Sequence, residues 1–234
     1  MKKLLLTLSL VCLLAPASQA LLINEWVSND ISTDDHEFIE LCGIPEDILD
    51  GLSIILIEGE GTGKGTIDRV IDLTGYALDA NGYFVIGDAA VSPDITMADG
   101  FIENGGNSII LVYGLQQAQG TDIDTDDDCL EDLPIGTVID AVGYGRPDQG
   151  DCMTYYGAVP VGPDGSYDPA GGARCSDCVG DWYLICLDGT EPNGPGCSIP
   201  EYQVGYATPG AANDCLEPSS VDNTYWGGIK SLYR

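Results

Sequence analysis

The sequence predicts an all-β protein, a β-sandwich with a loop-rich flank stapled by disulfides. Helical periodicity is nearly absent from the 234 residues, so long helices are not expected. Short runs of apolar and β-branched residues recur instead, and 31 glycines and 13 prolines punctuate them. Such runs, with turn residues between them, favour two antiparallel sheets that pack face to face.

The expected strands follow one another at short intervals along the chain. The first two are residues 21–27 and 37–42, and the third, 52–58, is nearly all apolar and therefore central in a sheet. Further strands are expected at 69–73, 83–86, 108–113 and 138–142. Residues 148–206 are rich in glycine, proline and cysteine, which predicts the loop-rich flank, closing with 202–206.

The N-terminus has the features of a secretion signal. Lys2 and Lys3 precede an apolar stretch, and residues 18–20 (Ser-Gln-Ala) fit a small-x-small cleavage site. We expect residues 1–20 to be removed. The alternative is an uncleaved anchor helix, although the apolar stretch is short for a membrane span.

Three segments are expected after the signal. Residues 21–215 form the domain, and 216–224 form a polar linker. Residues 225–234 form a short tail that is aromatic and basic, unlike the acidic domain. We interpret the tail as a sorting or attachment signal, and the alternative is a segment that docks on the sandwich.

The charge of the chain restricts its partners. Aspartate and glutamate number 38 against 8 lysines and arginines, which gives a formal net charge of −30. Affinity for nucleic acid depends on basic side chains that displace counterions from phosphates, so a nucleic-acid partner is not expected. The same charge favours divalent cations. No stretch beyond the signal is long and apolar enough to span a membrane.

Eight cysteines follow the predicted signal, and in an exported chain they are expected to form disulfides. The sequence leaves their pairing open. An alternative is a structural zinc site around Cys175, Cys178, Cys186 and Cys197. The eight are Cys42, Cys129, Cys152, Cys175, Cys178, Cys186, Cys197 and Cys215.

A run of aspartates provides the clearest chemical signal. In an extended segment alternate residues point the same way, so Asp122, Asp124, Asp126 and Asp128 are expected to converge on one cation. Calcium, which takes six to eight oxygen ligands in loose geometry, suits such a loop. The glycine and distal glutamate of a helix-loop-helix calcium site are missing, and the alternative is a solvated acidic loop.

Catalysis has little support in the sequence. A Ser-His-Asp or Cys-His arrangement would have to use His36, the single histidine, which lies in a polar loop at 28–36 that is expected to be exposed. A two-carboxylate glycosidase remains as the alternative, because so many acids make some pair inevitable. Asn24 and Glu25 are expected to bond loop backbone rather than to catalyse.

Several segments in order carry a family resemblance: Ile23-Asn-Glu25, Glu37-Phe-Ile-Glu-Leu41, Asp50-Gly51-Leu52, Gly82-Tyr-Phe-Val-Ile-Gly87, Asn104-Gly-Gly-Asn-Ser-Ile-Ile-Leu111, Val138-Ile-Asp-Ala-Val-Gly-Tyr144 and Thr208-Pro-Gly-Ala-Ala-Asn213. Over about residues 21–214 the chain resembles the lamin-tail domain family of secreted bacterial proteins. The resemblance implies an immunoglobulin-like β-sandwich without catalytic residues. We therefore expect a non-catalytic secreted or cell-surface module with a binding or structural role and a protein or glycan partner, and the alternative is a carboxylate-based hydrolase acting on extracellular polysaccharide.

Overall fold

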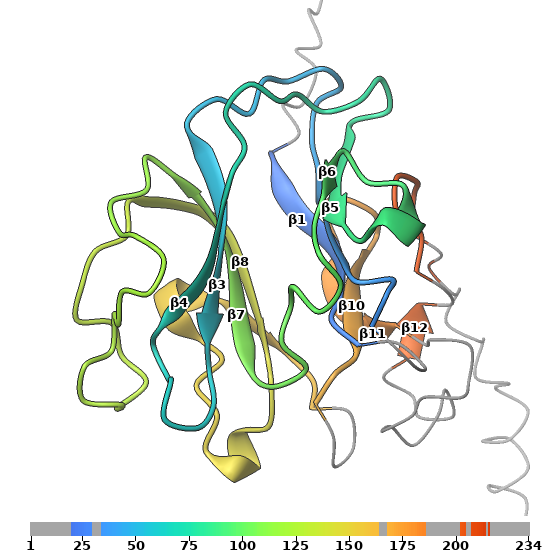
Figure 1. Cartoon of the computed structure of the whole chain (residues 1–234). Coiled ribbons are helices and arrows are strands. Elements are labelled where there is room, and N and C mark those ends of the chain that lie inside the picture. Colours follow the sequence, from blue (N-terminus) through green and yellow to red (C-terminus); the bar gives the residue numbers. More distant parts are fainter. Residues whose placement is uncertain are drawn as a thin grey trace, which may run out of the picture.

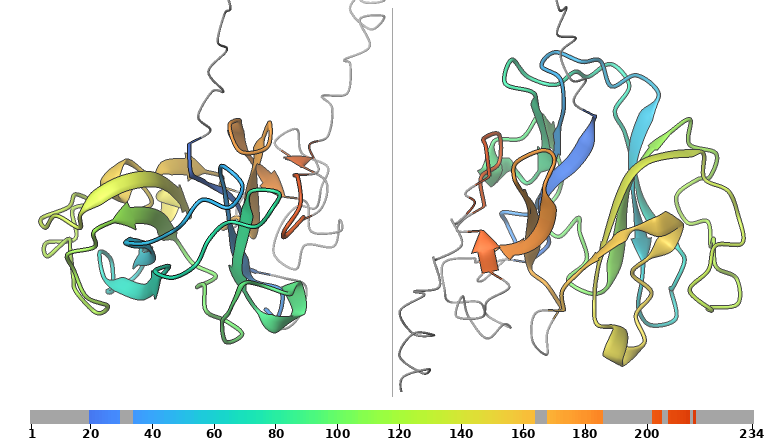
Figure 2. Two further views of the ribbon diagram at one scale, coloured as in Figure 1. Left: turned by 90° about the horizontal axis from the view of Figure 1, so that it is seen from above. Right: turned by 180° about the vertical axis from the view of Figure 1, so that it is seen from behind.

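Two β-sheets pack face to face in the computed structural model of the chain (Figures 1 and 2). The structure describes residues 20–29, 34–163, 168–185, 202–204, 207–213 and 215. The all-β sandwich predicted from the sequence is therefore confirmed.

The first sheet has seven strands in the order β12-β11-β10-β1-β2-β5-β6. Its neighbours are antiparallel except for the two outermost pairs, β5–β6 and β11–β12, which are parallel. The strands are β1 (Leu22–Val27), β2 (Phe38–Cys42), β5 (Tyr83–Gly87), β6 (Ile95–Thr96), β10 (Gly171–Cys175), β11 (Asp181–Ile185) and β12 (Tyr202–Val204).

The second sheet has five strands in the order β4-β3-β7-β8-β9, of which only β8–β9 is a parallel pair. Its strands are β3 (Leu52–Glu58), β4 (Ile67–Asp72), β7 (Asn107–Tyr113), β8 (Thr137–Tyr144) and β9 (Val159–Val161). Three single-turn 3₁₀ helices complete the described part, namely η1 (Ala89–Val91), η2 (Pro147–Gln149) and η3 (Tyr155–Gly157).

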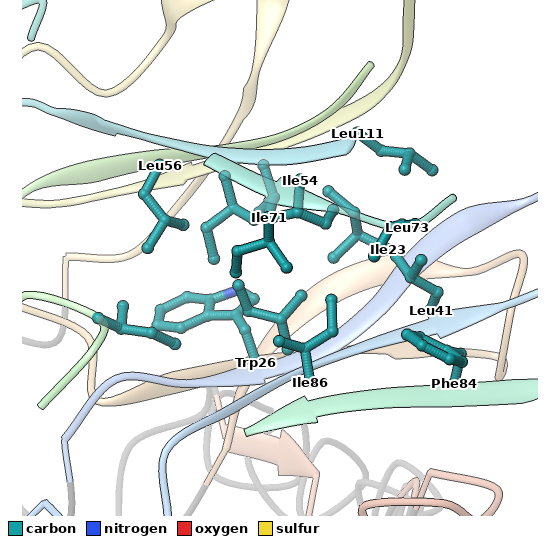
Figure 3. Close-up of a cluster of buried hydrophobic side chains, with 14 of the residues drawn as sticks. Ile23, Trp26, Leu41, Ile54, Leu56, Ile71, Leu73, Phe84, Ile86 and Leu111 are labelled. Atoms are coloured by element: carbon teal, nitrogen blue, oxygen red, sulfur yellow. The ribbon is translucent and has the colours of Figure 1, made fainter. Parts of the chain in front are cut away.

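The main core lies between the sheets (Figure 3). Successive residues of a strand point to opposite faces, so Ile54 and Leu56 of β3 enter this core together with Ile23 and Trp26 of β1. The Trp26 ring stacks on that of Tyr144 with centroids 4.0 Å apart. Each large apolar side chain buried here contributes about 1.5–3 kcal/mol relative to an exposed one.

The outer faces of the two sheets are also buried. Ile55 and Ile57 of β3 belong to a second cluster on the outer face of the five-stranded sheet, with Ile123 and Ile135 from the loop between β7 and β8. A third cluster on the outer face of the seven-stranded sheet includes Phe38. These outer layers explain why β3 and β7 read as continuous apolar runs.

The predicted loop-rich flank contains more strands than the sequence indicated. It contributes β9 to one sheet and β10, β11 and β12 to the other, where β10 pairs directly with β1. β10 begins Gly171-Gly172-Ala173, which gives no apolar run for a sequence pattern to detect. The small residues are needed because a Cβ at Gly172 would lie 3.0 Å from Nε1 of Trp26.

Three disulfides fasten the described part of the chain. Cys42 pairs with Cys178, Cys129 with Cys152, and Cys175 with Cys215, with Cα–Cα separations of 5.6, 5.1 and 5.7 Å. The zinc alternative is therefore wrong for Cys175 and Cys178, since their sulfur atoms are used in disulfides. The remaining cysteines, Cys186 and Cys197, lie outside the described residues, so a fully oxidised chain stays a prediction. So do the secretion signal at 1–20, the linker at 216–224 and the tail at 225–234, which lie outside them apart from residue 20.

Candidate functional site

The acidic loop, residues 122–132, brings together three of the four predicted metal ligands. Carboxylate oxygens of Asp124, Asp126 and Asp128 all lie within 4.8 Å of one another. Asp124 is buried, whereas Asp126 and Asp128 are exposed, so the group opens to solvent on one side. Three carboxylates at this spacing offer the hard oxygen ligands that calcium prefers.

The reason for this convergence differs from the one expected. The loop is a series of turns and bends rather than an extended segment, with left-handed backbone at Asp127 (φ 58°) and Cys129 (φ 67°). Asp122 is not part of the cluster, because its Oδ1 turns back to accept the N–H of Asp124 at 3.0 Å. The predicted extended conformation is therefore wrong, although three of the four predicted ligands do meet.

Asp124 is the anchor of the acidic loop. Its Oδ1 accepts the N–H of Asp128 at 3.1 Å, and its Oδ2 accepts the N–H of Cys129 at 2.9 Å and the hydroxyl of Tyr155 at 2.7 Å. Ile123, beside it, is fully buried in the second cluster, and the Cys129–Cys152 disulfide closes the far end of the loop. The packed scaffold thus fixes the position of the Asp124 carboxylate.

The negative charges of the clustered aspartates repel one another in the acidic loop. The pKa of the exposed Asp126 carboxyl is raised, chiefly by the charge of Asp128, with smaller contributions from its slight burial and from Asp132 and Asp124. Within the described residues no lysine or arginine donates a hydrogen bond to these carboxylates. Asp132 instead accepts the N–H and hydroxyl of Thr125, which lowers its pKa. A divalent cation would relieve the repulsion between the clustered charges.

A second group of carboxylates was not predicted from the sequence. Oxygens of Glu58 at the end of β3, Asp68 in β4 and Glu103 before β7 also lie within 4.8 Å of one another. Burial, together with the contact with Glu103, raises the pKa of Glu58 to about 8. Burial and the charge of Glu103 likewise raise the pKa of Asp68. Residues this far apart carry no spacing signal, so only the fold reveals the group.

A third polar network lies on the outer face of the seven-stranded sheet, beneath residues 207–213, which we call the C-terminal clasp. The pairing of β1 with β2 shifts register between Ile23 and Glu25, which leaves Asn24 as a bulge. Asn24 and Glu25 consequently both face outward, as does Glu40 of β2. All three side chains are fully buried.

The C-terminal clasp is bound by this network. Glu25 accepts the N–H of Thr208 at 3.0 Å, and Glu40 accepts the N–H of Gly210 at 2.6 Å. Oδ1 of Asn24 accepts the N–H of Cys178 at 2.8 Å. The expectation that Asn24 and Glu25 bond loop backbone is confirmed, and their role is to join the two ends of the domain. Figure 1 shows the clasp, in red, on the side of this sheet away from the other sheet.

His36 lies beside an aspartate at the surface of the protein. Nδ1 of His36 lies 2.7 Å from Oδ1 of the adjacent Asp35, and both side chains are largely exposed, as expected for this loop.

Comparison with known proteins gives no relative of this chain: it matches no family model, no curated protein and no solved structure. None of the helices among the described residues has the length and apolar character to cross a membrane.

Proposed function

We propose that this chain is a non-catalytic secreted or cell-surface module of the lamin-tail type, stabilised by calcium in the acidic loop. The observation that carries the proposal is the meeting of Asp124, Asp126 and Asp128 on a scaffold that holds Asp124 in place. The three disulfides and the secretion signal expected at 1–20 support an oxidising, extracellular location.

The proposed partner is a protein or glycan at the cell surface rather than a nucleic acid. A formal charge of −30 repels phosphate backbones and leaves few basic side chains to bind them. The terminal motifs that resemble those of lamin-tail domains contribute the carboxyls and amides that are buried under the clasp. Such a role is structural, which supports a module in which these residues do not catalyse.

Thermal unfolding tests the calcium proposal. The melting temperature of the mature protein is measured in chelator and in excess calcium, and calcium at 100 times its Kd is expected to add about 2.7 kcal/mol to the free energy of unfolding. The Asp126→Asn/Asp128→Asn variant, which leaves the anchor Asp124 intact, should lose this response. Asp47→Asn, at an exposed site outside the loop, is the matched control. Equal melting temperatures with calcium and chelator in the wild-type protein would refute the site.

The alternative function is a carboxylate-based hydrolase, and the observation in its favour is the second carboxylate group. Glu58, with a pKa raised to about 8 by burial, would be a protonated acid at neutral pH beside the exposed Glu103. Release of reducing sugar from extracellular polysaccharides, lost in both Glu58→Gln and Glu103→Gln, would favour the hydrolase. Absence of turnover across such substrates would favour the binding module.

A further inference from the structure

We propose that Glu25 and Glu40 form a proton-operated latch that closes the C-terminal clasp over the outer face of the seven-stranded sheet. In the closed state the two carboxyls hold protons and bind the backbone of Thr208 and Gly210. Loss of these protons opens the clasp. The latch lies apart from the acidic loop and does not depend on calcium.

Glu25 and Glu40 are buried, and no cation among the described residues accompanies their carboxyls. Glu25 and Glu40 are both 0% exposed. The clasp that covers them reads Ala-Thr-Pro-Gly-Ala-Ala-Asn and carries no charged side chain. Uncompensated burial of an ionised carboxylate is very costly, and such a group commonly takes up a proton instead.

The other groups around the latch do not supply positive charge. β5 contributes the hydroxyl of Tyr83, and the bend before β11 contributes Asp177, which accepts that hydroxyl at 2.7 Å. β10 contributes Arg174, but its guanidinium pairs with Asp140 of the other sheet, 2.9 Å away, and only its carbonyl reaches the clasp. Asp177 adds negative charge and disfavours ionisation of both glutamates.

Around the clasp, the hydrogen-bond contacts outnumber the available hydrogens when Glu25 is ionised. The hydroxyl of Thr208 lies 3.2 Å from Oε2 of Glu25 and 3.4 Å from Oδ1 of Asn213. If Glu25 is ionised, both neighbours are acceptors, and the single hydroxyl hydrogen can serve only one of them. A proton on Glu25 donates to the Thr208 oxygen and frees the Thr208 hydrogen for Asn213, so both contacts are satisfied.

The same shortage of hydrogens recurs at Asn24. Its Nδ2 has two hydrogens but lies near three acceptors: Oε1 of Glu40 at 2.8 Å, Oδ1 of Asp177 at 2.9 Å and Oδ1 of Asn213 at 3.3 Å. If these two hydrogens serve the two nearer acceptors, Oδ1 of Asn213 depends on the hydroxyl hydrogen of Thr208, which a proton on Glu25 sets free. The contacts among Thr208, Asn24 and Asn213 are therefore all satisfied when Glu25 is protonated and are one hydrogen short when it is not.

The expected pH range follows from burial. Burial raises the pKa of Glu25 to about 8 and that of Glu40 to about 9, from an ordinary value of 4.5. The closed clasp therefore favours protonated glutamates, and their contribution to its stability is complete only below the ordinary pKa of 4.5. This contribution falls as pH rises above that value, by up to about tenfold in the closing equilibrium per pH unit and per ionising group, and it is lost as pH passes through 8 and 9. The Cys175–Cys215 disulfide keeps the opened segment attached.

Carbon NMR of protein labelled at the glutamate side-chain carboxyls tests the protonation directly. The signals of Glu25 and Glu40, assigned with the Glu25→Gln and Glu40→Gln variants, are followed from pH 4 to pH 10. We expect both to change above pH 7, whereas an exposed glutamate such as Glu46 changes near pH 4–5. Midpoints of Glu25 and Glu40 below pH 6 would overturn the latch.

Limited proteolysis tests the opening. The rate of cleavage within residues 207–213 is measured by mass spectrometry at pH 6 and pH 10 and is normalised to an unstructured peptide at each pH. We expect a rise of about tenfold or more in the wild-type protein and no rise in the Glu25→Gln/Glu40→Gln variant, with Asp47→Asn behaving as wild type. An equal rise with and without the glutamates, or no rise in the wild type, would overturn the proposal. If the double variant fails to fold, Glu40→Gln alone should reduce the rise.

Discussion

Asn24 connects parts of the chain that lie far apart in sequence. Its amide group bonds Glu40 of the next strand, Asp177 and Cys178 before β11, and Asn213 of the C-terminal clasp. A fully satisfied buried network of this kind is cooperative, and removing one member leaves several polar groups without partners. At the residue scale Asn24 is therefore the position where we expect the fold to be most sensitive.

Asn24→Asp is predicted to lower the free energy of unfolding by about 3 kcal/mol or more. The change replaces a donor by a carboxylate among three acceptor oxygens, in a site without a cation. Asn81→Asp is the matched control, because Asn81 also donates to an aspartate, Asp79, but at an exposed turn. Urea unfolding of both variants measures the difference. A loss at Asn24 no larger than that at Asn81 would contradict the role assigned to the network.

The sequence predicted the chemistry of single residues better than their geometry. The aspartate run indicated a cation site because carboxylates were concentrated there, and three of them do meet. The turns of the loop, and the hydrogen bonds of Asp124 with Tyr155 and Cys129, determine which three aspartates meet. An alternating sequence pattern contains no information about these contacts. The group of Glu58, Asp68 and Glu103 was missed because its members come from three separate elements.

β10 is the element that most affects the seven-stranded sheet. It joins β11 and β12 to β1, and Arg174 within it forms a nearly buried ion pair with Asp140 of the opposite sheet. Its glycine at position 172 lies against the Trp26 indole, where a Cβ would be 3.0–3.2 Å from ring atoms. The small residue lets a large aromatic ring pack between the sheets.

Gly172→Val is predicted to destabilise the protein by about 1–3 kcal/mol through overpacking against the indole. The same substitution in a Trp26→Leu background should cost less, because the smaller side chain leaves room for the valine. A double-mutant cycle by urea unfolding gives the coupling between the two positions. Additive losses would show that the indole is not what restricts position 172.

Strands with strong apolar patterns were predictable, and those defined by their neighbours were not. β3 matches its predicted bounds, and β7 begins one residue earlier than expected, because each has buried side chains on both faces. β10 pairs through its backbone and has small residues where the tryptophan lies. Its position is decided by tertiary contact with Trp26, which local sequence patterns do not record.

At the scale of the whole molecule, an acidic surface encloses several buried carboxyls. Burial raises the pKa of Glu25 and Glu37 to about 8 and that of Glu40 to about 9. Glu37 is fully buried, and its Oε2 accepts the N–H of Ile102. The folded state therefore holds protons at neutral pH that the unfolded chain releases.

The free energy of unfolding is predicted to fall between pH 5 and pH 9. These glutamates have folded pKa values above the unfolded value of 4.5, so their contribution is complete below 4.5 and is lost as pH rises through 8 and 9. Asp72, whose pKa is lowered by its bonds to Thr74, acts in the opposite sense below its ordinary value of 3.8. Urea unfolding at pH 5, 7 and 9 should give decreasing values, with a smaller decrease in Glu37→Gln. Rising stability over this range would contradict the burial of neutral carboxyls.

Terbium luminescence tests the proposed calcium site most directly. Tyr155 donates its hydroxyl to Asp124, so a terbium ion held by the three aspartates would lie near the tyrosine ring and receive its excitation energy. We predict sensitised terbium emission on tyrosine excitation, its displacement by calcium, and its loss in Asp126→Asn/Asp128→Asn. Emission that is absent, or that persists unchanged in this variant, would contradict a cation site in the acidic loop.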